Sequence, residues 1–356
     1  MIYKFGIRLF LASVLFRYCE AGFPRNLAWT GGPVHTECEH SAKTLISSGQ
    51  YIKDNVVATK AVTFNDDVYI LTPRFKSGVL STIWLIVRGR RCVELQPFPE
   101  QHSHSLGDCN QIQNAIDFYL DYLGNLWILD SGIVETSEHP RCTCRPKVVV
   151  LSILLKKFTK QIQLSGLVVQ TSNLQNIVVE HAFGGPFVYI SDASRGAILV
   201  HDASSGEQRA VLACAPTLGL HMALVKKGLV QSVLVLTRMQ DGRVLEVNTN
   251  ALKRKEAGIA LRVYSDNSTP LIILGADTYH LYLRHATCAD VLSWDTREHI
   301  NSSLLMNIHS AGPRMIPTSV TAHPLKPVLL ILDNNYVDAT FNKMATYHRI
   351  TFVGQL

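Results

Sequence analysis

A short apolar phrase that ends on a polar residue recurs six times along this chain, and it constrains the fold more than any other feature. Its clearest copy lies within 118–134, which has the pattern of a strand, a turn and a second strand that ends on Asp130. The copies occupy 68–72, 126–130, 188–192, 233–237, 281–284 and 329–333, and their last residues are 58, 62, 45, 47 and 49 positions apart. Repetition at such intervals is typical of β-propellers, whose blades are small antiparallel sheets. The sequence therefore predicts an all-β, six-bladed β-propeller, with a different all-β fold as the alternative.

The segment 176–212 shows what one blade would contain. Four apolar strands are expected at 176–179, 187–190, 197–200 and 209–212, and turns rich in glycine and serine separate them. Four antiparallel strands joined by tight turns form the blade unit. No second domain is recognisable elsewhere, so 22–356 is predicted to be a single propeller domain.

The start of the chain is expected to lie outside this domain. Lys4 and Arg8 introduce an apolar run at 9–16, and the small residues Cys19 and Ala21 precede a cleavage position after Ala21. This pattern predicts a signal peptide at 1–21, because the run is shorter than the roughly 20 apolar residues that span a bilayer. The sequence thus predicts a secreted, extracellular protein without a membrane span. Sequons at Asn267 and Asn301 predict glycosylation, which fits secretion.

Charge and cysteine content restrict the partners further. The formal net charge of +6 is mild and the basic residues form no stripe, so no nucleic-acid partner is expected. Seven cysteines follow the predicted cleavage position, and in an oxidising compartment an odd number leaves a spare thiol or an intermolecular bond. Cys142 and Cys144 could instead hold zinc. Because no second cysteine or histidine pair lies near them at finger spacing, no metal is predicted.

The chain carries no recognisable enzyme motif and predicts no cofactor. Asp130, Asp192 and Asp333 could be converging carboxylates for acid/base work. The alternative, which we favour, is that each ends a strand and accepts backbone hydrogen bonds in the following turn. His102 and His104 could bind a metal, but their surroundings of proline and serine favour solvated loop histidines.

Several phrases resemble the yellow and major royal jelly protein family of insects, and they occur in family order from about residue 29 to 352. The matching segments are LTPRFKSGV at 71–79, LWILDSGIV at 126–134, CRPKVV at 144–149, FVYISD at 187–192, MAL at 222–224, SWDTR at 293–297 and TYHRI at 346–350. The resemblance implies a secreted six-bladed propeller, in agreement with the repeats.

The resemblance also implies a set of disulfides. The phrases around Cys92 and Cys109 imply a bridge between these two residues. The family usually has a cysteine where Leu123 stands, as the partner of Cys144. Because that cysteine is missing, Cys38 is the expected partner of Cys142 or Cys144.

Three functions follow from the resemblance. The phrase WTGG at 29–32, together with Cys38, is closest to the ovary-expressed g-type branch, which implies a non-enzymatic extracellular matrix component of the insect eggshell, in its vitelline membrane. Its partners would then be matrix or eggshell proteins. The first alternative is a dopachrome-converting enzyme of melanin formation, with a catechol ligand. The second is a binder of small biogenic amines in the central channel through Thr318 and Asn334, which could equally be ordinary turn residues.

Overall fold

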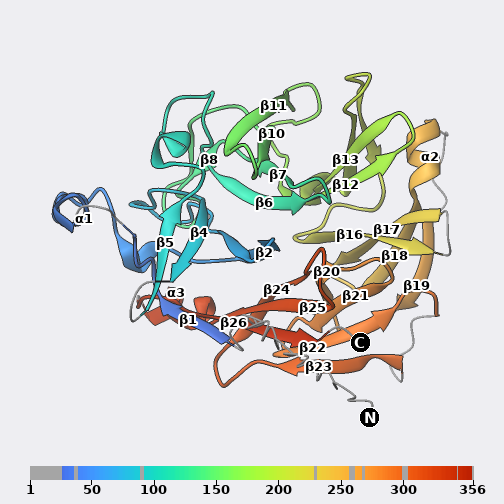
Figure 1. The fold of residues 1–356 in the computed structure, drawn as a ribbon. Coiled ribbons are helices and arrows are strands. Elements are labelled where there is room, and N and C mark those ends of the chain that lie inside the picture. The colour runs from blue at the N-terminus through green and yellow to red at the C-terminus, as the bar shows by residue number, and fades with distance from the viewer. Residues whose placement is uncertain are drawn as a thin grey trace, which may run out of the picture.

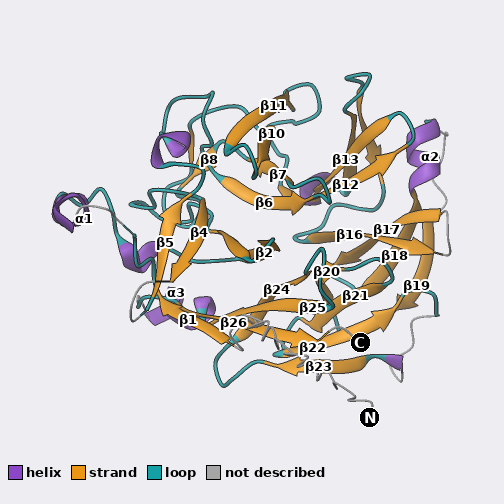
Figure 2. Cartoon of the chain, viewed as in Figure 1, coloured by secondary structure: helices purple, strands orange, loops and turns teal. Residues whose placement is uncertain are grey.

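Six four-stranded sheets form a closed ring in the described part of the chain, which confirms the predicted six-bladed propeller. The computed structural model describes residues 26–35, 39–88, 92–227, 231–255, 261–266, 269–298, 304–342 and 344–354. The predicted signal peptide 1–21, Cys38 and the sequons at Asn267 and Asn301 lie outside the described residues. Figure 1 shows the blades around a common centre, and Figure 2 shows that strands dominate while short helices lie at the periphery.

The blades follow one another along the chain, and we number them in that order. Blade 1 contains β2 (Lys60–Phe64), β3 (Asp67–Leu71), β4 (Ile83–Arg88) and β5 (Val93–Pro97). Blade 2 contains β6 (Ala115–Leu120), β7 (Asn125–Asp130), β10 (Lys147–Ser152) and β11 (Lys157–Gln163). Blade 3 contains β12 (Leu174–Ala182), β13 (Gly185–Asp192), β14 (Ala197–Asp202) and β15 (Gln208–Leu212).

The remaining blades repeat the pattern. Blade 4 contains β16 (Leu220–Lys227), β17 (Gln231–Arg238), β18 (Arg243–Asn248) and β19 (Leu261–Asp266). Blade 5 contains β20 (Leu271–Ala276), β21 (His280–His285), β22 (Asp290–Asp295) and β23 (Met306–Ser310). Blade 6 contains β24 (Ile316–Ala322), β25 (Val328–Asn334), β26 (Tyr347–Gly354) and β1 (Asn26–Thr30).

The copies of the repeated phrase coincide with the second strands of the blades, namely β3, β7, β13, β17, β21 and β25, and only the first copy extends one residue beyond its strand, to Thr72. A second strand sits between two others in its sheet and packs against neighbouring blades on both faces. The burial of β7 shows the consequence, because every residue from Leu126 to Asp130 is buried. Strands covered on both faces read as continuous apolar runs rather than alternating ones. This position explains why the phrase was recognisable in the sequence.

The two ends of the described chain meet in blade 6. Strand β1 pairs antiparallel with β26, so that Trp29 lies opposite His348. Figure 1 shows this as the blue strand beside the red one. Leu27 and Trp29 join a buried cluster that also contains Trp84 of blade 1 and Leu332 of blade 6. The N-terminal strand thereby closes the ring and joins its first and last blades.

Helices and a small hairpin decorate the ring. The helices are α1 (Glu39–Ser47), α2 (Thr249–Arg254) and α3 (Tyr336–Asn342), and the short 3₁₀ turns are η1 (Lys53–Asn55), η2 (Gln101–His104) and η3 (Ala193–Arg195). Strands β8 (Ile133–Val134) and β9 (Arg141–Cys142) form the hairpin. None of the helices in the described ranges has the length and apolar character that crossing a membrane requires.

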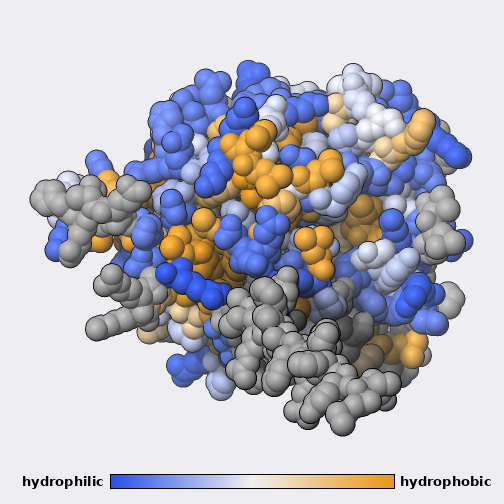
Figure 3. Space-filling view, viewed as in Figure 1, coloured by the Kyte–Doolittle hydropathy of each residue, from blue (hydrophilic) through white to orange (hydrophobic). Residues whose placement is uncertain are grey.

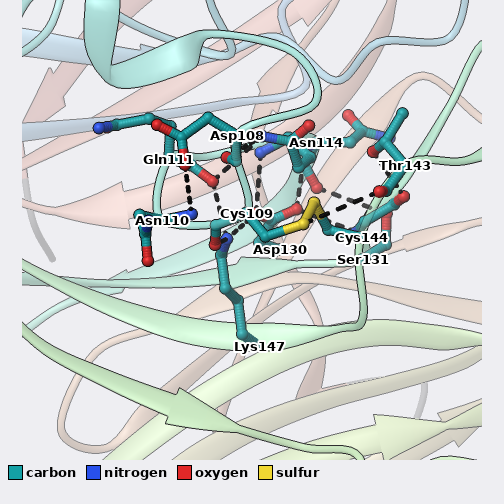
Figure 4. A network of polar contacts seen from close by, with 12 residues as sticks. Asp108, Cys109, Asn110, Gln111, Asn114, Asp130, Ser131, Thr143, Cys144 and Lys147 are labelled. Atoms are coloured by element: carbon teal, nitrogen blue, oxygen red, sulfur yellow. Dashed lines mark hydrogen bonds and ion pairs between the residues drawn. A yellow bond between two sulfur atoms is a disulfide. The ribbon is translucent and has the colours of Figure 1, made fainter.

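The disulfide differs from the expected one. Cys109 is bonded to Cys144, with Cα atoms 5.6 Å apart, and Cys92 is an exposed free thiol. The predicted Cys92–Cys109 bridge is therefore wrong, as is a bond from Cys144 to Cys38. The loop that carries Cys109 folds over the end of β7, where Lys147 Nζ donates to the Cys109 carbonyl (Figure 4). Cys144 lies just before Lys147 in sequence, so the same contact brings the two thiols together.

Candidate functional site

A cavity of about 730 Å³ opens at one end of the central channel. It is lined by the later parts of the first strands of blades 2 to 6, by the turns that follow several of them, and by Lys60 and Val62 of β2. First strands line the channel of a propeller because they are the innermost strand of every blade. The cavity is therefore formed by the ring of blades as a whole and not by a single loop. Because it is concave and partly enclosed, it is the candidate binding site of the propeller.

An ion pair lies in the cavity wall. Lys60 Nζ donates to Asp117 Oδ1 at 2.7 Å, and the side chain of Asp117 is almost fully buried. The second oxygen of Asp117 accepts the backbone N–H of Ile177 at 2.9 Å. Blades 1, 2 and 3 thus meet at one carboxylate. Lys60 compensates the negative charge of Asp117. This carboxylate therefore chiefly holds the three blades together at the cavity wall.

A second carboxylate lies at the cavity mouth. Asp121 follows β6 and is buried, and its Oδ1 accepts the backbone N–H groups of Leu123 and Asn125 at 2.9 Å. Its Oδ2 accepts Trp127 Nε1–H at 2.9 Å. Asp121 therefore fixes the turn between β6 and β7, the local role that aspartate commonly has in turns.

His181 shares this carboxylate. Its Nε2 lies 3.1 Å from Asp121 Oδ2, and its ring meets that of Tyr122 edge-on, with centroids 4.9 Å apart. Because an ionised carboxylate only accepts hydrogen bonds, Nε2 carries the proton of the neutral ring and Nδ1 remains the acceptor. An imidazole oriented in this way by a buried carboxylate can exchange a proton with a bound molecule.

The rest of the lining is mostly apolar. Phe118, Met222, Ala223 and Leu224 contribute to it. Tyr119 adds a phenol that stays protonated at neutral pH, since burial, helped by Asp121 and Glu180, raises its pKa to about 12. A cavity with apolar walls and a few polar groups at its mouth suits a small amphipathic molecule.

The three aspartates considered for acid/base chemistry end or nearly end the second strands of their blades, and all are buried. Asp130 accepts the backbone N–H groups of Gln113 and Asn114 at 2.8 Å each. Asp192 accepts that of Asn173 at 2.9 Å. Asp130 also accepts the backbone N–H of Gly132 at 3.0 Å, which confirms the predicted role in the following turn for this residue. In the turn after its strand, Asp192 accepts the Ser194 hydroxyl at 3.0 Å in place of the expected backbone N–H.

Asp333 has different partners. It accepts from the side chains of His309, at 2.9 Å, and Arg349, at 2.7 Å. The expected backbone hydrogen bonds are replaced here by charged side chains of blades 5 and 6. None of Asp130, Asp192 and Asp333 is among the residues that line the cavity.

The two residues proposed to contact an amine, Thr318 and Asn334, are not among the residues that line the cavity. Thr318 sits at a bulge of β24, and its hydroxyl donates to the Leu332 carbonyl at 3.3 Å. Asn334 is buried at the end of β25 and donates from Nδ2 to the Ala58 carbonyl at 2.7 Å. Neither residue is part of the described cavity lining, so their contact with a ligand stays a prediction.

The histidines of the loop after blade 1 differ from each other. His102 is exposed as expected, but His104 is buried and its Nε2 donates to the Phe98 carbonyl at 2.9 Å. The prediction of a solvated His104 is therefore wrong, because the loop folds inward over blade 1. Burial lowers the pKa of His104 to about 3.

No metal cluster of three or more histidine, cysteine or acidic side chains occurs in the described ranges. The Cys142 and Cys144 pair considered for zinc has lost one ligand, since Cys144 is in the disulfide. Sequence reasoning missed Asp117, Asp121 and His181 altogether. Asp121 could have been found, because an aspartate just before Gly124 and Asn125 is a turn signal at the end of the first strand.

Comparison with known proteins shows a family that part of this chain resembles. The sequence profile described as "Major royal jelly protein" matches residues 113–211, which include β6, β7, β12 and thus Asp121 and His181. Protein yellow of Drosophila melanogaster is 29% identical over 126 residues, which cover 34% of this chain and 23% of that protein. Protein yellow of Drosophila erecta is 33% identical over 102 residues, which cover 27% and 19%. Over residues 113–211 the chain is therefore similar to the yellow and major royal jelly protein family.

The matched region spans less than a quarter of the length of these two yellow proteins. The fold of this chain is also found in a distant structure. A luciferin-regenerating enzyme superposes with a TM-score of 0.51 at 11% identity, over 84% of this chain and 93% of that one. At such identity the likeness concerns the fold alone. The cavity and its Asp121–His181 pair are the features of this chain that bear on its function.

Proposed function

We propose that this yellow-family propeller acts outside the cell as a non-enzymatic component of an extracellular matrix, the insect eggshell, and holds a small molecule in its central cavity. The observation that carries the proposal is that the cavity carboxylates already have protein partners. Asp117 is paired with Lys60, Asp121 accepts several donors, and Asp277 accepts the Tyr282 hydroxyl at 2.7 Å. Such a cavity offers shape and apolar contact more than reactive groups.

Sequence features support the location and the tissue. The predicted signal peptide at 1–21 supports export, and the phrase at 29–32 together with Cys38 supports the g-type branch. The Cys109–Cys144 bridge fits an oxidising compartment. An extracellular matrix requires proteins that withstand long exposure, and a ring closed by its own N-terminal strand meets this requirement.

Knockdown in females tests the tissue. We expect eggs that collapse or desiccate while cuticle colour is unchanged. N-terminal sequencing of the protein from insect-cell medium should begin after Ala21. Normal eggs with altered pigment would refute the eggshell proposal, and an intracellular product that retains Met1 would refute the location.

Dopachrome conversion is the second candidate, and one observation favours it. The Asp121–His181 pair at the cavity mouth, 3.1 Å apart, is the acid/base arrangement that a proton shift in a bound catechol derivative would need. Purified protein can be assayed directly with dopachrome. If the protein converts dopachrome, His181→Gln should lower the turnover rate on the order of 10²-fold while the midpoint of thermal unfolding stays unchanged.

His102→Gln is the matched control, since His102 is exposed on a loop outside the cavity lining. Turnover by the unaltered protein that is lost only in His181→Gln would replace the matrix proposal with the enzymatic one. Absence of turnover in the unaltered protein would leave the matrix proposal standing.

A further inference from the structure

Apolar side chains protrude from several hairpin turns of the propeller, and apolar groups lie among polar ones on the surface (Figure 3). Phe183, at the tip of the β12–β13 hairpin, is fully exposed. Leu325, in the β24–β25 turn, is 79% exposed, and Tyr122, in the β6–β7 turn, is 72% exposed. Leu154 and Leu155, in the β10–β11 turn, are 66% and 61% exposed. A single exposed apolar residue needs no explanation, but a group on one face does.

These turns lie on one face because of the topology. In a blade that runs as an antiparallel meander, the first-to-second and third-to-fourth turns fall at the same end of the ring. Contacts between the turns confirm the arrangement. The Tyr122 ring packs against His181 at the end of β12, and Ile153 at the end of β10 donates to the Gly124 carbonyl at 3.0 Å. His323 Nε2 lies 2.9 Å from the Asn65 carbonyl in the β2–β3 turn.

The same face holds the cavity mouth, since Tyr122, His181 and Leu325 all line it. We call this set of protruding side chains the apolar rim: Tyr122, Leu154, Leu155, Phe183 and Leu325. The rim therefore lies on the face that holds the entrance of the channel, with its residues on blades 2, 3 and 6.

Lysines accompany the rim. Lys156 and Lys157 directly follow Leu155 and are exposed, and Lys226 is exposed at the end of β16. Several of the acidic groups on this face have partners. Asp66 pairs with Lys326 at 2.7 Å, Glu207 pairs with Lys255 at 2.6 Å, and Asp202 accepts the backbone N–H of Ser204 at 2.9 Å. The face therefore combines apolar tips with a modest excess of positive charge.

We propose that the apolar rim docks onto a lipid surface that carries anionic headgroups. The tips are one or two residues wide and stand on separate hairpins, so they can enter the headgroup layer side by side without forming a continuous groove. Tyrosine suits this interface because its ring is apolar and its hydroxyl is polar, and lysine keeps its charge among the headgroups while its stem lies along apolar neighbours. The combination of apolar and basic residues is the one that binds anionic membranes peripherally.

This docking does not depend on the ligand in the cavity or on the tissue. It would place the channel entrance against the lipid, so that an amphipathic molecule could pass from the lipid into the cavity.

Vesicle sedimentation tests the proposal with the full secreted chain. Vesicles of phosphatidylcholine with added phosphatidylserine should bind the protein, and pure phosphatidylcholine vesicles should bind it less. Phe183→Ser and Leu154→Ser should each weaken binding roughly tenfold, the effect expected when one large apolar side chain no longer leaves water. Lys156→Glu combined with Lys157→Glu should weaken binding to the anionic vesicles only.

Leu218→Ser is the matched control. Leu218 is 78% exposed in the connection between β15 and β16, and blade topology places that connection on the opposite face. Binding that falls in Phe183→Ser and Leu154→Ser but not in Leu218→Ser supports the proposal. Absence of binding to both kinds of vesicle overturns it. Concentration-dependent dimers that Phe183→Ser dissolves would also overturn it, because a second copy would then cover the rim.

Discussion

The backbone N–H of Ala58 donates a hydrogen bond of 2.9 Å to Nε2 of His348, although the two residues are 290 positions apart. The carbonyl of Ala58 accepts Asn334 Nδ2 at 2.7 Å. Ala58 lies just before β2 of blade 1, whereas Asn334 and His348 lie on β25 and β26 of blade 6. Both backbone polar groups of one buried residue are thus satisfied by side chains across the junction of the first and last blades. We call these two hydrogen bonds the Ala58 clamp. The clamp closes the ring together with the pairing of β1 and β26.

Asn334→Ala should destabilise the protein by about 1–3 kcal/mol, because it leaves the buried Ala58 carbonyl without a donor. Chemical denaturation followed by tryptophan fluorescence measures the effect. Thr318→Val is the control and should cost less than about 1 kcal/mol, since the Thr318 hydroxyl is half-buried and its hydrogen bond is 3.3 Å long. If Asn334→Ala kept full stability and lost binding of an amine, Asn334 would be a ligand contact and not part of the clamp.

Stability should fall as the pH drops below about 6.5. Burial lowers the pKa of both His104 and His348 to about 3, so these residues stay neutral in the folded protein while they take up protons in the unfolded chain. Between pH 6.5 and 3 the unfolded state binds more protons, and the free energy of unfolding decreases by up to about 1.4 kcal/mol per pH unit for each such histidine.

Substitution separates this effect from other titrations. His104→Gln should reduce the slope of stability against pH in that window, because glutamine takes up no proton in the unfolded chain. Equal slopes in the unaltered protein and His104→Gln would show that His104 is not buried as a neutral ring.

The Cys109–Cys144 bridge should stabilise the protein by about 4 kcal/mol, as expected for a loop with a sequence separation of 35. Cys144→Ser should therefore lower the denaturation midpoint strongly. Cys92→Ser should leave it unchanged, since Cys92 is an exposed free thiol. Peptide mapping under non-reducing conditions should recover Cys109 and Cys144 in one linked fragment, and a fragment linking Cys92 to Cys109 would contradict the structure.

Some of these features could be predicted from the sequence, and the reason is physical. The second strands were recognisable because burial on both faces forces a continuous apolar run, and the turn aspartates because a strand end needs acceptors for the following N–H groups. The segments that resemble the yellow and major royal jelly protein family predicted the same fold independently. These signals are local, and they survive in a single sequence.

The cavity mouth and the cysteine pairing were not predictable in the same way. Asp121 and His181 come from different blades, and only the closed ring brings them together. Cys109 meets Cys144 because Lys147 draws the 109–111 loop over β7, which is a partly buried contact across 38 positions. The family pattern misled here, because it points to a partner at Leu123 that this chain lacks. Long-range polar contacts of this kind leave no periodic trace in the sequence.

Lys147 should be the most sensitive of the buried charged residues around Asp130. Its side chain is 1% exposed, its Nζ lies 3.5 Å from Asp130 Oδ2, and it also donates to the Gln111 carbonyl at 2.7 Å (Figure 4). Lys147→Met should destabilise the protein by about 3 kcal/mol or more, because it leaves a fully buried carboxylate without its counter-charge. Lys157→Met, at an exposed position, should have almost no effect. Addition of Asp130→Asn to Lys147→Met should recover part of the loss, since the uncompensated charge is then gone. If the double variant were instead less stable than Lys147→Met by the full cost of Asp130→Asn alone, the two charges would act independently and the ion pair would not explain the burial of Lys147.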